Sequence, residues 1–123
     1  DVTGFGLAGH ALELARAAQC SLNIEWSRVP LIDGVIKLAA DGIATGASGR
    51  NFASYGHDIA LPADFAPPDK ALLTDPQTSG GLLVSCATES VAEVLAVFRR
   101  HGFAAAAEVG EVLPSGPAAL VVR

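Results

Sequence analysis

The sequence contains no methionine, one tryptophan, one tyrosine and only two cysteines among its 123 residues. Charge is also scarce, at 17% of residues, and acidic side chains outnumber basic ones, which gives a formal net charge of −5. This acidic balance argues against a nucleic-acid partner, because such proteins bind phosphates through a basic face. No apolar run approaches the roughly 18 residues of a membrane span, so we expect no membrane partner and a cytoplasmic location.

The two cysteines, Cys20 and Cys86, lack the spacing of a metal or redox motif. We interpret both as small buried apolar residues. The length suits one domain with a single core and is too short for two. Because the chain has no methionine and begins inside a glycine-rich motif, we interpret residues 1–123 as one C-terminal domain excised from a longer chain.

Hydrophobic periodicity predicts intermixed helices and strands without strict βαβ alternation, which favours a layered α+β sandwich with a mixed sheet. Strands are predicted at residues 21–26, 82–86, 105–112 and 118–122. Helices are predicted at residues 7–18, 33–40 and 91–100, with a small-residue loop at 44–51 opening a short helix that runs through Phe52 to Tyr55. Residues 61–69 are predicted to be irregular.

Two of these helices carry recognisable features. The first is expected to present an apolar face made of Leu7, Ala11, Leu14, Ala15 and Ala18. The last is expected to begin with a capping box formed by Ser90 and Glu93 and to end at Gly102. Its predicted buried stripe consists of Val91, Val94, Leu95 and Phe98.

The opening residues match the dinucleotide-binding pattern G-x-G-x-x-G from Gly4 to Gly9. That reading is disfavoured, because the carboxylate of Asp1 would repel a bare pyrophosphate and no further parallel β-α units follow. A second reading is a glycine-rich turn into a helix. A third assigns Asp1 as a Mg²⁺ ligand, with the Thr3 hydroxyl and the N–H groups of Gly4 and Gly6 beside a phosphate.

A second polar loop spans residues 75–81 and ends in two glycines. It is either a proline-initiated turn capped by Asp75 or a cradle in which Thr78, Ser79 and Gly80 bind an oxyanion. The loop at 44–51 adds one guanidinium, that of Arg50, for a phosphate. No nucleophile has an adjacent base, so no catalytic residue is assigned.

The two remaining candidates for chemistry are histidines. His10 lies on the flank of the first predicted helix, and His57 follows a Tyr-Gly pair in a loop. Both are interpreted as hydrogen-bonded structural residues.

Three stretches together carry a family resemblance: DVTGFGL with Gly9 and His10, NFASYG at residues 51–56, and DPQTSGGL at residues 75–82. In order and spacing, the whole chain resembles the C-terminal domain of the selenophosphate synthetase family. The TGFG and TSGG elements are also similar to the wider superfamily of aminoimidazole ribonucleotide synthetase, thiamine-monophosphate kinase and a hydrogenase-maturation dehydratase. The loop at residues 45–49 matches the family only loosely.

The resemblance implies a layered α+β fold, partly similar to ferredoxin-like topology. It also implies a reaction in which ATP, selenide and water give selenophosphate, AMP and orthophosphate with Mg²⁺, the selenophosphate serving selenocysteine and selenouridine synthesis. Asp1 is carried over as a metal ligand, whereas ATP is bound mainly by an N-terminal domain. That domain would be the partner of this one, would hold the reactive residues and would form a homodimer, so the isolated domain is expected to be inactive.

Two alternatives remain open, the first within the superfamily that the chain resembles and the second from the residues themselves. One is the C-terminal half of another ATP-using member of the superfamily, of the thiamine-monophosphate kinase or aminoimidazole ribonucleotide synthetase type. The other is a noncatalytic anion-binding module, which the missing nucleophile favours.

Overall fold

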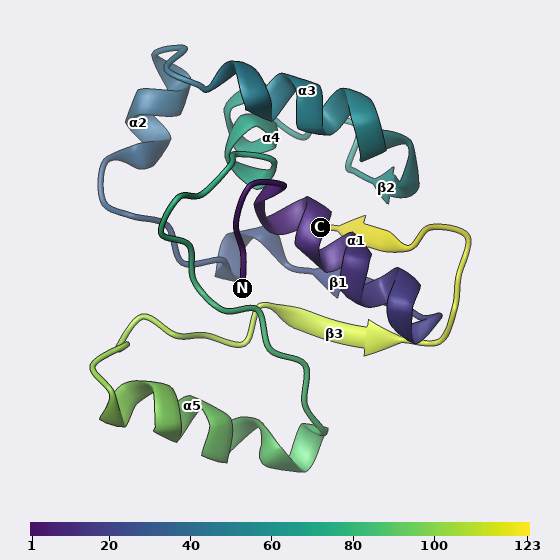
Figure 1. Ribbon diagram of the computed structural model, residues 1–123, viewed down its shortest axis with the longest axis vertical. Helices are drawn as coiled ribbons and strands as arrows, with labels where there is room; N and C mark the ends of the chain where they lie inside the picture. The colour runs from purple at the N-terminus through teal and green to yellow at the C-terminus, as the bar shows by residue number, and fades with distance from the viewer.

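A mixed four-stranded sheet in the order β2-β4-β1-β3 organises residues 1–123 in the computed structural model (Figure 1). The strands are β1 (Ser21–Ile24), β2 (Ile59–Ala60), β3 (Gly110–Leu113) and β4 (Leu120–Val122). Strand β1 runs parallel to β4 and antiparallel to β3, and β2 runs parallel to β4. The mixed sheet confirms the predicted α+β class.

Five α-helices accompany the sheet. They are α1 (Gly6–Ala18), α2 (Val35–Ala40), α3 (Gly46–Tyr55), α4 (Pro67–Leu73) and α5 (Val91–Arg100). Short 3₁₀ turns lie at Trp26–Arg28, Gly56–Asp58 and Thr88–Ser90. Helix α3 is longer than predicted, and α4 begins inside a segment predicted to be irregular, because two prolines suit the first turn of a helix. None of the helices is both long and apolar enough to cross a bilayer.

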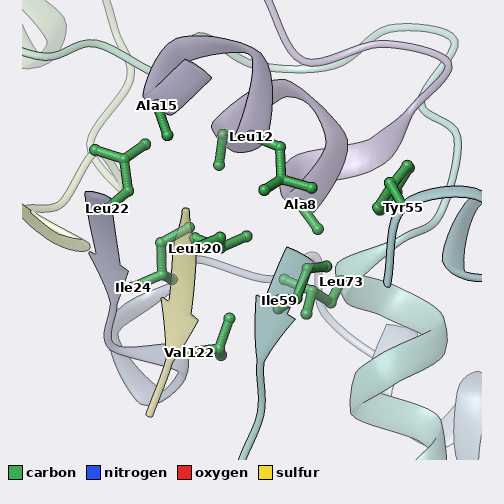
Figure 2. Packing of buried hydrophobic residues seen from close by; sticks show 11 residues of the cluster. Ala8, Leu12, Ala15, Leu22, Ile24, Tyr55, Ile59, Leu73, Leu120 and Val122 are labelled. Carbon is green, nitrogen blue, oxygen red and sulfur yellow. The ribbon is translucent and has the colours of Figure 1, made fainter. Parts of the chain in front are cut away.

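The core lies between α1, the strands β1, β2 and β4, and the helices α3 and α4 (Figure 2). Leu12, Leu73 and Leu120 have no exposed side-chain surface. The apolar residues of β1 and β4 alternate, so that Leu22 and Leu120 sit side by side beneath α1. The other cluster members are Ala8, Ala11, Ala15, Ile24, Tyr55, Ile59 and Val122.

The buried face of α1 differs from the predicted one. Its core residues are Ala8, Ala11, Leu12 and Ala15. Leu14 is 39% exposed and Ala18 lies at the exposed end of the helix, so these two assignments were wrong. The small alanines allow α1 to approach the sheet closely, and Leu12 is the one large side chain that this face buries completely.

The predicted strand at residues 82–86 was also wrong. This segment has no regular structure, and Leu82 and Val84 are 64% and 48% exposed. The apolar residues favour a strand, but a strand also needs a hydrogen-bonded neighbour, and no segment pairs with these residues. Cys86 is consequently exposed rather than buried, whereas Cys20 packs against the core as expected.

Helix α5 forms where it was predicted, beyond β3 and apart from α3 and α4 (Figure 1). The predicted capping box does not form: Ser90 makes no side-chain hydrogen bond to the helix. Residues 88–90 already form a 3₁₀ turn that continues into α5, so Ser90 has helical backbone angles instead of the extended angles of a capping residue. None of the α5 residues is fully buried.

Candidate functional site

Two loops that are distant in sequence lie against each other ahead of α1. We call residues 1–5 the first loop and residues 75–81 the second loop. The N–H of Val2 donates to the carbonyl of Gly81 over 2.9 Å, and the N–H of Gln77 donates to the carbonyl of Thr3 over 2.9 Å. The structure therefore brings together the two loops for which an anion site was one of the sequence-based interpretations.

Two glycines permit this close approach. Gly6 has φ +69°, and a Cβ there would lie 2.7 Å from the backbone carbon of Thr74. A Cβ on Gly80 would overlap the carbonyl oxygen of Val2. The N–H of Gly6 donates to the carbonyl of Thr3 over 3.1 Å, inside the turn. Both glycines thus have a structural task in joining the loops.

Asn51 of α3, expected only as part of the small-residue loop at 44–51, hydrogen-bonds to both loops. Its Nδ2 donates to the carbonyl of Gly4 over 3.0 Å and to the carbonyl of Thr74, next to the second loop, over 3.0 Å. Tyr55, one helical turn further on, donates its hydroxyl to the carbonyl of Phe5. The recognisable signal was the NFASYG stretch, whose first and fifth residues lie on one face of a helix.

The first residues of α3 are hydrogen-bonded to the second loop and to α4. The hydroxyl of Thr45 caps the helix by accepting from the N–H of Ser48 and donates to Asp75 Oδ1 over 3.1 Å. The buried Ser48 hydroxyl donates to the carbonyl of Ala71 over 2.7 Å. The Asp75 side chain therefore binds the start of α3 and does not cap its own turn as one interpretation of the loop expected, and the Ser48 hydroxyl is occupied within the fold. Arg50 is exposed and forms no ion pair.

Most of the residues that the sequence offered for binding a metal ion or a phosphate are exposed at the joined loops. Asp1, Gly4, Thr78 and Ser79 are exposed, whereas Thr3 and Gly80 are half-buried. The N–H groups of Gly4, Thr78, Ser79 and Gly80 donate to no backbone acceptor, and the Asp1 carboxylate has no ion-pair partner. Unpaired amides next to a free carboxylate can bind an anion together with a cation.

The chain contains no group of three or more His, Cys, Asp or Glu side chains that could hold a metal ion. Asp1 therefore does not belong to a ready-made cluster of such side chains, and a metal ion bound there would need further ligands.

Burial affects one ionisable side chain at the site. It raises the pKa of Tyr55 to about 12, so the hydroxyl remains a hydrogen-bond donor throughout the physiological range. Away from the site, the hydrogen bond from Arg16 lowers the pKa of Asp58. The histidine beside it, His57, lies 3.6 Å from Asp58 and is largely exposed.

The whole chain, residues 1–123, matches the family model described as AIR synthase related protein, C-terminal domain. It is 57% identical over 118 residues to the selenide, water dikinase of Burkholderia orbicola, covering 96% of this chain and 33% of that protein. The enzyme of the same name from Pseudomonas straminea is 55% identical, covering 98% of this chain and 34% of that protein. The one from Dechloromonas aromatica is 44% identical, covering 95% and 34%. The chain thus spans about a third of the length of these relatives.

Proposed function

Because the chain belongs to the family of AIR synthase related C-terminal domains, we propose that it is the C-terminal part of a selenide, water dikinase. The activity would convert ATP, selenide and water into selenophosphate, AMP and orthophosphate. The observation that carries the proposal is the 57% identity to a protein of that name across 96% of this chain. The joined loops support it, because they concentrate the groups that bind a metal–phosphate unit.

Within this activity the loops would bind phosphate and magnesium. The free N–H groups of Gly4, Thr78 and Ser79 are suited to phosphate oxygens, and Asp1 offers the hard carboxylate oxygen that Mg²⁺ prefers. A magnesium ion bound there would neutralise phosphate charge during transfer. Asp1 fits such a role because it is exposed and has no ion-pair partner.

The remaining machinery would lie on a separate N-terminal domain. That domain would bind most of the ATP, carry the reactive residues and pair into a homodimer. The two free thiols fit a reducing compartment, so we propose a cytoplasmic location.

The test uses the full-length protein that contains these residues. With ATP, Mg²⁺ and selenide, we expect phosphorus NMR to detect selenophosphate together with AMP and orthophosphate. Activity with thiamine phosphate or a formylglycinamidine substrate instead of selenide would assign the protein to another branch of the superfamily.

The role of Asp1 is tested with Asp1→Ala in the same protein. We expect a large loss of rate and a higher Mg²⁺ requirement, because a metal ligand has been removed. Asp33→Ala is the matched control, since Asp33 is also exposed but lies outside both loops. An Asp1→Ala enzyme with an unchanged rate and Mg²⁺ dependence would remove the metal assignment while leaving the reaction intact.

A further inference from the structure

A chain of three polar side chains lies directly behind the first loop. Thr3 Oγ1 is 3.1 Å from His10 Nε2, and His10 Nδ1 is 2.7 Å from Glu13 Oε2. His10 and Glu13 lie one turn apart on α1, and the His10 side chain is only 15% exposed. His10 was expected to be a structural residue. The signal for the wider chain of side chains was the spacing H-x-x-E on a helix, with His10 seven residues after Thr3.

The direction of the hydrogen bonds follows from the chemistry of the groups. A carboxylate only accepts, so Glu13 requires the proton of the imidazole on Nδ1. In the neutral ring, Nε2 then carries a lone pair and accepts the proton of the Thr3 hydroxyl. Thr3 has therefore used its single proton, and its oxygen can only accept from a ligand. Such an oxygen suits a water molecule and does not suit an unprotonated phosphate oxygen.

The Thr3 hydroxyl is held firmly at the joined loops. The carbonyl of Thr3 accepts from the N–H groups of Gly6 and Gln77, over 3.1 and 2.9 Å. The ring of Phe5 lies 5.8 Å from the His10 ring, tilted by 50°. The backbone of the threonine and the ring of the histidine are thus both held, which gives the hydroxyl a defined direction two residues from Asp1.

This inference rests on the proposed function, which consumes water. Forming AMP, orthophosphate and selenophosphate from ATP breaks two phosphoanhydride bonds. One phosphoryl group goes to selenide and the other goes to water, whose oxygen ends in orthophosphate. The water must lose a proton as it attacks, and proton transfer of this kind needs a positioned acceptor.

We propose that Thr3 binds this water and that His10 receives its proton through Thr3. As the water oxygen bonds to phosphorus, its proton passes to Thr3 Oγ1 while the proton of Thr3 passes to His10 Nε2. The bond from that phosphorus to the bridging oxygen breaks, and the electron pair leaves on the AMP phosphate. Glu13 stabilises the imidazolium ion, which later releases its proton to solvent.

The experiment measures product ratios in the full-length protein with ATP, Mg²⁺ and selenide. For His10→Gln we expect the formation of AMP and orthophosphate to fall by about 100-fold, the lower part of the range for acid–base catalysis. ADP should accumulate beside selenophosphate, because transfer to selenide does not use this water. Thr3→Val should give the same shift, Thr3→Ser should restore the AMP fraction, and Glu13→Gln should cause a smaller shift.

The matched control is His57→Gln, an exposed histidine that lies beside Asp58 and outside both loops, and it should leave the product ratio unchanged. Thermal unfolding of each variant checks folding, and the nearly isosteric Thr3→Val serves if His10→Gln does not fold. Equal losses of all products, or additive effects of Thr3→Val and His10→Gln, would overturn the proposal. A wild-type protein that forms no AMP with selenide would instead overturn the proposed function.

Discussion

The region built on α1, α3, α4 and the strand β4 contrasts with the stretch of residues 82–103 in how it buries its apolar side chains. In the first region, Leu12, Leu73 and Leu120 are fully buried. In the second, Leu82 and Phe103 are 64% and 63% exposed, and none of the α5 residues is fully buried. Yet the apolar stripe of α5 has the same spacing as the buried face of α1 and carries larger side chains, Val91, Val94, Leu95 and Phe98. An amphipathic pattern therefore specifies a helix and its apolar face, but not a surface that covers that face.

Hydrogen bonding shows the same contrast. The first region is joined by side-chain bonds between distant segments, from Asn51 and Tyr55 to the first loop and from Thr45 to the second. Residues 82–103 make no side-chain hydrogen bond to the rest of the chain, and their backbone bonds outside helix α5 are local. The candidate site thus belongs to the well-connected region, where its geometry can be maintained.

The largest expected difference between the two regions concerns leucines. Leu12→Ala should lower the free energy of unfolding by about 2–5 kcal/mol, because it leaves a cavity under α1. Leu95→Ala on α5 should cost less than about 1 kcal/mol, since its side chain is only partly buried. Urea denaturation of both variants measures the difference. Equal losses of unfolding free energy would mean that α5 is packed as firmly as α1, and the difference in packing between the two regions would then be wrong.

The next effect concerns the junction of the two regions at the end of the second loop. Gly80→Ala should cost about 1–3 kcal/mol, because the added Cβ overlaps the carbonyl of Val2 and forces the loops apart. Gly81→Ala is the matched control: a Cβ there meets nothing within 4 Å, so stability should change by less than about 0.5 kcal/mol. If the two alanine variants unfold at the same urea concentration, the loops are not closely joined.

An effect of similar size, but without a steric clash, is expected within the well-connected region. Asn51→Ala removes two hydrogen bonds of 3.0 Å and should cost about 2 kcal/mol, at about 1 kcal/mol for each bond. Amide hydrogen exchange should also increase in both loops while remaining unchanged in α5. Ala53→Ser on the exposed side of α3 is the control, and it should alter neither measurement. Unchanged loop exchange in Asn51→Ala would show that Asn51 does not hold the two loops.

The sequence allowed the α+β class, most elements and both loops to be predicted, because these depend on local patterns such as glycine turns and apolar periodicity. The buried face of α1 was predicted incorrectly, since Ala8 and Leu12 are distinguished from Leu14 only by where the sheet lies. The strand at 82–86 failed for a related reason, because pairing depends on a partner segment. His10 was interpreted only as structural and Asn51 only as part of a small-residue loop, because their partners, Thr3 and Gly4, are defined by tertiary contacts.

The smallest expected effect is the loss of folding stability at alkaline pH that the ionisation of Tyr55 causes. Burial raises its pKa to about 12 from 10.0, so the unfolded chain loses this proton at a lower pH than the folded protein. The folded state then binds more protons between pH 10 and 12, and stability must fall as pH rises through that window. The loss attributable to Tyr55 is about 1 kcal/mol at pH 10.5. Tyr55→Phe, which cannot ionise, should lack this part of the decline, although it loses the bond to Phe5 at every pH. The free energy of unfolding of both proteins, measured between pH 9 and 10.5, checks this. If the two values fall in parallel, the Tyr55 hydroxyl is not buried, and this part of the well-connected region is packed no more tightly than residues 82–103.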